Sequence, residues 1–218
     1  MNQPIFITGV ERSGSTLIAR IFDLCGAFSG EKTNMFENIP LGFLIRHSGI
    51  QSYSSSPVPL TKDLIFPEGW ENKVLISLKD QDYKDGAWMF KSSLLTTTWP
   101  MWHKAFPNAK WIIVRRKTPD IIQSCMKTGY MTMFKNKNNL DKIGKATSEE
   151  GWKWLIHEYE NKFVEMIQAG VNCKQIWPER MVTGDYQQIY EVLEWVGLPW
   201  NDQIVETIDP LLNKSRRK

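Results

Sequence analysis

Short apolar runs alternate with helical apolar stripes in the first part of the chain. Ile5 to Thr8 is an apolar run followed by Gly9, a pattern typical of a strand that is buried in a parallel sheet. The next segment has apolar residues at helical spacing and reaches a glycine at Gly26, which predicts a helix that ends there. The residues of this stripe are Leu17, Ile18, Ile21, Phe22 and Cys25.

The alternation of strand and helix continues through the middle of the chain. Residues 88–90 predict a second strand that ends at Lys91, and residues 95–106 predict the helix that follows it. Residues 110–115 are the clearest strand pattern in the sequence, because Trp111 to Val114 are aromatic or β-branched without interruption.

Capping residues mark the later helices. Thr118 is expected to cap a helix that has Pro119 at its first position. The segment Thr147 to Glu150 has the capping-box pattern, so a long helix is expected to begin there. Apolar residues at helical spacing between residues 189 and 196 predict a further helix, which stops at Gly197.

Repeated strand–helix–strand units predict an α/β fold in three layers, with a mostly parallel central sheet flanked by helices. The chain has 218 residues, of which 42% are hydrophobic and 23% charged, and this suits one domain over residues 1–218. Two polar stretches, 51–59 and 135–139, are expected to be loops within that domain.

Cysteine usage, charge and hydropathy narrow the class of protein. Cys25, Cys125 and Cys173 are far apart and lack metal-binding spacing, so we expect reduced core residues of a cytoplasmic protein without a metal site. No signal peptide precedes the first strand, and no window reaches the ~18 apolar residues that span a bilayer, so no membrane association is expected. The net charge of +3 is too small to indicate a nucleic-acid partner.

The segment Gly9 to Thr16, with the sequence GVERSGST, carries the strongest chemical signal. It lies between the first strand and the first helix, where backbone N–H groups and the helix N-terminus bind anions. Gly14 allows close approach of a ligand, and Arg12 supplies positive charge. The hydroxyl groups of Ser13, Ser15 and Thr16 add donors, so this loop is expected to hold a phosphate or sulfate group.

The loop differs from the P-loop of nucleotide hydrolases in its cation. Ser15 occupies the position where that P-loop has the lysine for the β- and γ-phosphates, and Arg12 is two residues before the glycine instead. A kinase or hydrolase also needs acidic residues that hold Mg²⁺, and no acidic residue clearly ends a predicted strand. A P-loop-like nucleotide kinase is therefore the alternative and not the preferred interpretation.

The sequence Arg12-Ser-Gly-Ser-Thr-Leu17, directly after a strand, resembles the 5′-phosphosulfate loop of sulfotransferases that use 3′-phosphoadenosine 5′-phosphosulfate (PAPS). The resemblance implies a P-loop-like sulfotransferase fold, and it covers the chain from Ile5 to about Pro199. It also implies that Arg12 and the loop residues Ser13, Gly14, Ser15 and Thr16 bind the 5′-phosphosulfate of the donor. No metal takes part in the reaction of this family.

The sequence 111–124, WIIVRRKTPDIIQS, is similar to the 3′-phosphate segment of the same family. The match implies that Arg116 and Ser124 bind the 3′-phosphate of PAPS and that Asp120 lies at the family's acidic position. A guanidinium at the carboxyl end of a strand is well placed to bind a phosphate. Arg115 is the alternative if the strand register differs by one residue.

A weaker match concerns the catalytic groups. Phe90-Lys91-Ser92-Ser93 resembles the segment where cytosolic members have Lys-x-His, which implies that Lys91 stabilises the leaving group. Ser93 replaces the histidine and is no general base at neutral pH, so the base lies elsewhere. Gly30-Glu31-Lys32-Thr33 resembles a region where other members keep a catalytic glutamate, so Glu31 is the expected base and Glu37 the next choice.

Together these matches predict a PAPS-dependent sulfotransferase, an enzyme of EC 2.8.2 type that moves a sulfuryl group to a hydroxyl or amine and releases adenosine 3′,5′-bisphosphate. A PAPS- or nucleotide-binding protein without turnover is the second alternative, because Ser93 replaces the histidine. The acceptor, a small molecule, sugar or peptide, and the oligomeric state are left open by the sequence. A role for the basic residues after 213 at the 3′-phosphate is also left open.

Overall fold

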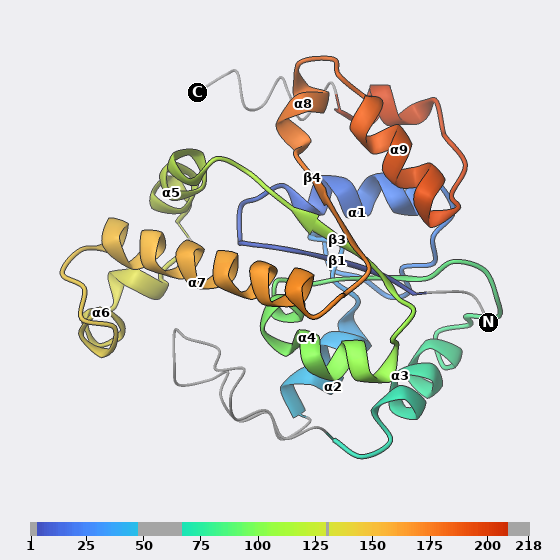
Figure 1. Cartoon of the computed structure of the whole chain (residues 1–218), viewed down its shortest axis with the longest axis horizontal. Helices are drawn as coiled ribbons and strands as arrows, with labels where there is room; N and C mark the ends of the chain where they lie inside the picture. The colour runs from blue at the N-terminus through green and yellow to red at the C-terminus, as the bar shows by residue number, and fades with distance from the viewer. Residues whose placement is uncertain (1–3, 48–66, 130, 209–218) are drawn as a thin grey trace.

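A four-stranded parallel sheet lies at the centre of the computed structural model, which describes residues 4–47, 67–129 and 131–208. The strands pair in the order β2-β1-β3-β4, and each described pair is parallel. The expected α/β fold with a central parallel sheet is therefore confirmed (Figure 1). The strands are β1 (Ile5–Gly9), β2 (Met89–Lys91), β3 (Lys110–Val114) and β4 (Cys173–Ile176).

Helices cover both faces of this sheet, which makes the three expected layers (Figure 1). One face packs against α2 (Ile39–His47), α3 (Trp70–Lys79), α4 (Leu94–Ala105), α5 (Thr118–Lys127) and α7 (Ser148–Gln168). The other face packs against α1 (Ser15–Leu24), α8 (Pro178–Val182) and α9 (Gln187–Val196). The short α6 (Lys137–Lys142) lies near α7 at the far end (Figure 1).

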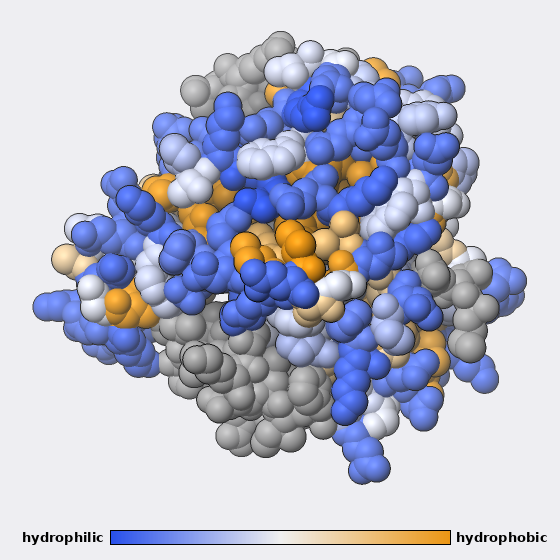
Figure 2. Space-filling model, viewed as in Figure 1, coloured by the Kyte–Doolittle hydropathy of each residue, from blue (hydrophilic) through white to orange (hydrophobic). Residues whose placement is uncertain are grey.

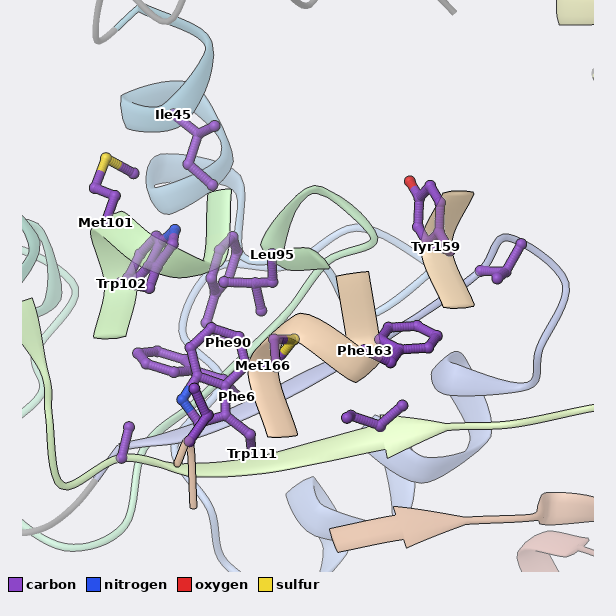
Figure 3. Close-up of a cluster of buried hydrophobic side chains, with 14 of the residues drawn as sticks. Phe6, Ile45, Phe90, Leu95, Met101, Trp102, Trp111, Tyr159, Phe163 and Met166 are labelled. Carbon is purple, nitrogen blue, oxygen red and sulfur yellow. The ribbon is translucent and has the colours of Figure 1, made fainter. Parts of the chain in front are cut away.

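Alternate residues of the strands face opposite layers. Phe6 of β1 points toward α4 and α7 and makes edge-to-face contacts with Trp102 and Trp111, at ring-centroid distances of 5.1 and 4.8 Å. Figure 3 shows this aromatic cluster between the strands and the two helices. Its neighbours in β1, Ile5 and Ile7, face the other layer with α1 and α9. The strands are thus buried on both sides, which agrees with their nearly continuous apolar sequence.

The strand order places a crevice at the carboxyl ends of β1 and β3. From β1 the chain passes to β2 on one side of β1, whereas β3 lies on its other side. The order of strands reverses between β1 and β3, and ligands of open parallel sheets bind at such a reversal. The segments after β1 and β3, which carry the two phosphate-type sequences, therefore meet at one place.

Two local expectations are wrong. Thr118 does not cap α5, since it is the first residue of the helix and Lys117 is the N-cap, without a side-chain hydrogen bond. Pro119 consequently occupies the second helical position, where its missing N–H also costs no helical hydrogen bond. Residues 135–139 are largely helical, because Asn136 accepts a hydrogen bond from the backbone N–H of Asn138 and caps α6.

The capping box at Thr147 is confirmed, since Thr147 and Glu150 bond each other's backbone N–H groups at the start of α7. The described cysteines are unpaired; Cys25 and Cys125 are buried and Cys173 is half-buried. Hydrophilic residues cover most of the face in Figure 2, around a hydrophobic area near its middle. In the described part of the chain, no helix combines the length and hydropathy that would cross a bilayer. The expected loop 51–59 and the basic residues after 213 lie outside the described residues.

Candidate functional site

A cavity of about 660 Å³ opens where the ends of β1 and β3 meet. Its volume is in the range of small-molecule binding sites. Segments from several parts of the chain line it, and the loop after β1 contributes the largest share. Its lining includes residues 9–17, the loop residues 34–37, Lys91, Ser93, Arg116 and Asp120.

The loop after β1 has a backbone shaped for an anion. Gly14 has a φ of 99° and is the N-cap of α1, so the first amides of that helix, which have no partner within the helix, lie at the cavity wall. Arg12 adopts a φ of 68°, an uncommon conformation for a residue with a side chain. Strained backbone of this kind is concentrated at functional sites, where the surrounding structure maintains it.

Ser13 and Gly9 pack the floor of this loop. The hydroxyl of Ser13 is buried and, among the described residues, has no hydrogen-bond partner. A Cβ at Gly9 would lie 2.7 Å from that hydroxyl and 2.6 Å from the carbonyl oxygen of Val114, so only glycine fits. An unsatisfied buried donor costs ~1–3 kcal/mol, and an anionic oxygen bound in the loop would remove that cost. These features fit a phosphate or phosphosulfate group.

The two phosphate-type segments are joined by two hydrogen bonds that both involve Arg12. Arg116 Nη1 donates to the carbonyl oxygen of Arg12 at 3.0 Å, and Arg12 Nε donates to Ser124 Oγ at 3.0 Å. Arg116 and Arg12 line the cavity, whereas Ser124 lies behind Arg12 and is not part of the lining. The structure thus brings all three expected residues together, with Ser124 holding the guanidinium of Arg12.

Arg115, the alternative to Arg116, points to a different part of the molecule. Its guanidinium forms an ion pair with Glu160 and lies over the rings of Phe163 and Trp177, at 5.6 and 5.7 Å from their centroids. These contacts hold Arg115 against α7, outside the cavity. The strand register therefore directs Arg116 and not Arg115 toward the site.

Lys91 ends β2 with its ammonium group at the cavity wall. The residue is 6% exposed, and its Nζ lies 3.0 Å from a carboxylate oxygen of Glu37. Glu37 belongs to the loop after α1, which turns back over the site: the backbone of Lys32 bridges to Asn38, and Thr16 Oγ1 donates to the carbonyl oxygen of Met35 at 3.4 Å. This turn brings Glu37 to the cavity.

Glu31, the expected base, lies outside the cavity lining. Its side chain is exposed, and its backbone N–H donates to Gln81 Oε1 at 2.9 Å while its carbonyl oxygen accepts from Ile39. The chain reversal that carries Glu37 to the site leaves Glu31 on the outer side. Of the two carboxylates that the sequence offered as the base, only Glu37 lines the cavity.

The site also contains Glu11, a carboxylate that the sequence reasoning missed. It lies directly before Arg12 and lines the cavity, and its Oε2 is buried without a hydrogen-bond partner among the described residues. Burial raises the pKa of Glu11, while hydrogen bonds from its own backbone and from the Ser93 side chain, together with the charge of Lys91, oppose that rise. The sequence did contain a signal for Glu11. An acidic residue within an anion-binding loop repels the anion, so its presence there suggests a separate role.

No cluster of three or more possible metal ligands occurs among the histidines, cysteines and acidic residues that the structure describes. The charged groups that line the cavity are the cations Arg12, Arg20, Arg116 and Lys91 and the carboxylates Glu11, Glu37, Asp120 and Glu179. Cations of this kind suit a doubly anionic ligand, and carboxylates beside them suit proton transfer.

Comparison with known proteins gives a consistent result. A family model described as "Sulfotransferase family" matches residues 4–202. The solved structure of sulfotransferase STF9 from Mycobacterium avium superimposes with a TM-score of 0.59 at 14% identity, over 98% of this chain and 68% of that one. Sulfotransferase STF1 from Mycobacterium tuberculosis H37Rv gives 0.56 at 12% identity, over 96% and 71% of the respective chains. These likenesses show a shared fold. No curated protein matches.

Proposed function

Since the chain belongs to the sulfotransferase family, we propose that it transfers a sulfuryl group from PAPS to a hydroxyl or amine. The observation that carries this proposal is the loop of residues 9–16, with its helix N-terminus, its buried unpaired Ser13 hydroxyl and the Arg12 guanidinium beside a cavity. In this proposal the loop amides and Arg12 hold the 5′-phosphosulfate. The protein acts in the cytoplasm, with an acceptor whose identity the site does not specify.

Arg116 is proposed to select PAPS by its 3′-phosphate. It lines the cavity at the end of β3 and is tied to the backbone of the phosphosulfate loop through Arg12. A guanidinium in that position can form two charge-assisted hydrogen bonds with a phosphate. Ser124 is proposed to assist, either on the 3′-phosphate itself or through its hydrogen bond with Arg12.

The transfer is an in-line displacement at sulfur. The acceptor oxygen or nitrogen forms a bond to sulfur while the bond from sulfur to the bridging oxygen breaks, and the electron pair of that bond stays on the 5′-phosphate of adenosine 3′,5′-bisphosphate. Arg12 and Lys91 neutralise the charge that develops on this leaving group. The acceptor must also lose a proton, which requires a basic group in the cavity.

The ligand choice tests this function. We expect purified protein to bind adenosine 3′,5′-bisphosphate without added metal and to bind ATP with Mg²⁺ much more weakly, because Ser15 replaces the P-loop lysine. Isothermal titration calorimetry with both ligands, each with and without Mg²⁺, measures the difference. Tighter binding of ATP that depends on the metal would instead support a nucleotide kinase.

The Arg116→Ala variant tests the 3′-phosphate role. Loss of charge-assisted hydrogen bonds should weaken binding of adenosine 3′,5′-bisphosphate by roughly 10- to 100-fold, which corresponds to about 1.5–3 kcal/mol. Binding of adenosine 5′-phosphosulfate, which has no 3′-phosphate, should change little. Arg46→Ala, an exposed arginine of α2 outside the cavity, is the matched control. Equal weakening of both ligands would contradict the assignment.

Ser124→Ala in the same assay separates the two roles of this hydroxyl. If Ser124 binds the 3′-phosphate, only the ligand that carries this group should weaken. If Ser124 acts through Arg12, whose Nε donates a hydrogen bond to its hydroxyl, binding of both ligands should weaken together. Neither result changes the proposed reaction, but the two results place the hydroxyl at different ends of the donor.

A further inference from the structure

Glu11 and Ser93 both lie in the wall of the cavity, although 82 positions separate them in the sequence. Both residues line the cavity, and the Ser93 side chain lies close enough to the Glu11 carboxyl group to lower its pKa as a hydrogen-bonding partner. One carboxyl oxygen of Glu11, Oε2, is buried and has no partner among the described residues. A carboxyl group that is this enclosed and only partly hydrogen-bonded is costly to ionise, so its position calls for a physical explanation.

The polar packing around Ser93 fixes its direction. Ser93 is the N-cap of α4, and the neighbouring Thr8 of β1 donates to the carbonyl oxygen of Ser92 at 3.0 Å. Thr8 also lies 2.6 Å from the hydroxyl of Thr96, one turn into the same helix. Both threonines are fully buried, so these bonds are shielded from water. The start of α4 is therefore attached to β1, the strand whose end carries Glu11.

We propose that Ser93 and Glu11 form the proton acceptor of the transfer, with the Ser93 hydroxyl as relay and the Glu11 carboxylate as final base. The proposal rests on the proposed function and deepens it by assigning the basic group. Glu37 is the less suitable base, because its carboxylate accepts a hydrogen bond from the Lys91 ammonium at 3.0 Å. Glu31 lies outside the cavity lining.

The step balances as a concerted relay. As the acceptor oxygen forms its bond to sulfur, its proton passes to Ser93 Oγ, and the hydroxyl proton of Ser93 passes to a Glu11 carboxylate oxygen. Serine ends the step neutral, as it began, and Glu11 ends it as a carboxylic acid. The bridging oxygen leaves sulfur with its electron pair, and the proton on Glu11 returns to water after the product departs.

The charged groups around Glu11 set the pH at which this base works. Burial is the largest influence and raises the pKa of Glu11, and the charge of Glu37 adds to the rise, whereas Lys91 opposes it. Arg12 adjoins Glu11 in the loop. Cys125 packs nearby on α5 and has its pKa raised to about 12 by burial and by Glu11, so its thiol stays neutral in the neutral range. Activity should therefore fall on the acid side as Glu11 becomes protonated, at a pH above the ordinary pKa of a glutamate.

The Glu11→Gln variant removes the base but keeps an amide oxygen that can accept from Ser93. With labelled PAPS and a panel of phenols, amines and water as acceptors, release of adenosine 3′,5′-bisphosphate should fall by ~10²-fold, and the acid limb of its pH profile should disappear. Ser93→Ala should cause a similar loss. The double variant should be no slower than either single variant, because both residues serve one relay. Glu194→Gln, on the exposed side of α9, is the control.

Two measurements exclude unfolding as the cause. The variants should bind adenosine 3′,5′-bisphosphate within about twofold of the parent chain in calorimetry. The melting temperature of Glu11→Gln should be ~2–4 °C above that of the parent at pH 8. The reason is linkage: since the folded pKa of Glu11 is raised, its ionisation destabilises the folded chain increasingly as the pH rises through that pKa.

The outcomes distinguish this inference from the proposed function. A Glu11→Gln enzyme that keeps the parent rate and the acid limb overturns the assignment of the base while the sulfotransferase function stands. A fully active Ser93→Ala enzyme beside an inactive Glu11→Gln enzyme overturns the relay. A parent chain that binds no adenosine 3′,5′-bisphosphate, or releases none from PAPS with any acceptor, overturns the proposed function and this inference with it.

Discussion

Replacing Arg12 by alanine is expected to lower kcat/KM for sulfuryl transfer by ~10³-fold or more, the size of effect known for an arginine that stabilises charge in phosphoryl transfer. Arg12 lies in the loop after β1 with a φ of 68°, and its Nε donates a hydrogen bond to Ser124 Oγ. The guanidinium is thus oriented in the absence of a ligand, so in the proposed reaction it stabilises the leaving phosphate without reorganisation. Initial rates with labelled PAPS, measured for parent and variant, give the ratio.

Two further variants make the Arg12 result specific. Arg12→Lys should recover part of the lost rate, because a lysine restores the charge but not the directed hydrogen bond to Ser124. Arg46→Ala, which removes an exposed arginine from α2, should leave the rate unchanged. An Arg12→Ala enzyme within tenfold of the parent would show that the loop amides alone hold the leaving group and that Arg12 has another role.

Replacing Lys91 by methionine is expected to lower kcat by ~10²–10³-fold, the usual cost of removing one charge-stabilising donor from an active site. Lys91 is 6% exposed, so its ammonium acts in a poorly solvated site where charge interactions are strong. Methionine keeps the volume of the side chain and avoids a cavity in the core. Rapid-mixing measurement of a single turnover with bound PAPS reports the chemical step directly.

The fold should tolerate the Lys91→Met change. Glu37, the partner of Lys91, has a side chain that is 38% exposed, so water can solvate its carboxylate after the ammonium is gone. Lys73→Met, at an exposed position of α3, is the matched control for loss of a lysine. A Lys91→Met enzyme with the parent kcat but weaker PAPS binding would place Lys91 in donor binding only.

Local sequence was sufficient for the secondary structure that frames the site. The strand at Ile5, the glycine-rich turn and the helix that begins at Ser15 depend on residues close to one another in the chain. Apolar periodicity, glycine at a positive φ and capping residues act over a few positions, so their consequences can be read without the rest of the fold. Two local expectations were wrong. Lys117 and not Thr118 is the N-cap of α5, and residues 135–139, expected to form a loop, contain the start of α6.

The parallel order of strands then accounts for the joint position of Arg12 and Arg116. Both residues follow strands whose carboxyl ends meet where the strand order reverses. The choice between Arg116 and Arg115 required the register of β3, because a shift of one residue exchanges the two faces of a strand. That register is set by pairing with β1 and β4, and it turns Arg115 toward Glu160.

Only the tertiary structure decided which carboxylates belong to the site. Glu31 and Glu37 are six positions apart, and the bridge between Lys32 and Asn38 reverses the chain between them, so that one lies outside the cavity and the other lines it. Glu11 lies beside Ser93 because β2 pairs in parallel with β1. The chain that leaves β2 therefore enters α4 close to the carboxyl end of β1, where Glu11 lies. Proximity of this kind comes from sheet pairing over more than 80 residues, and burial, which raises the pKa of Glu11, is a property of the folded whole rather than of any sequence window.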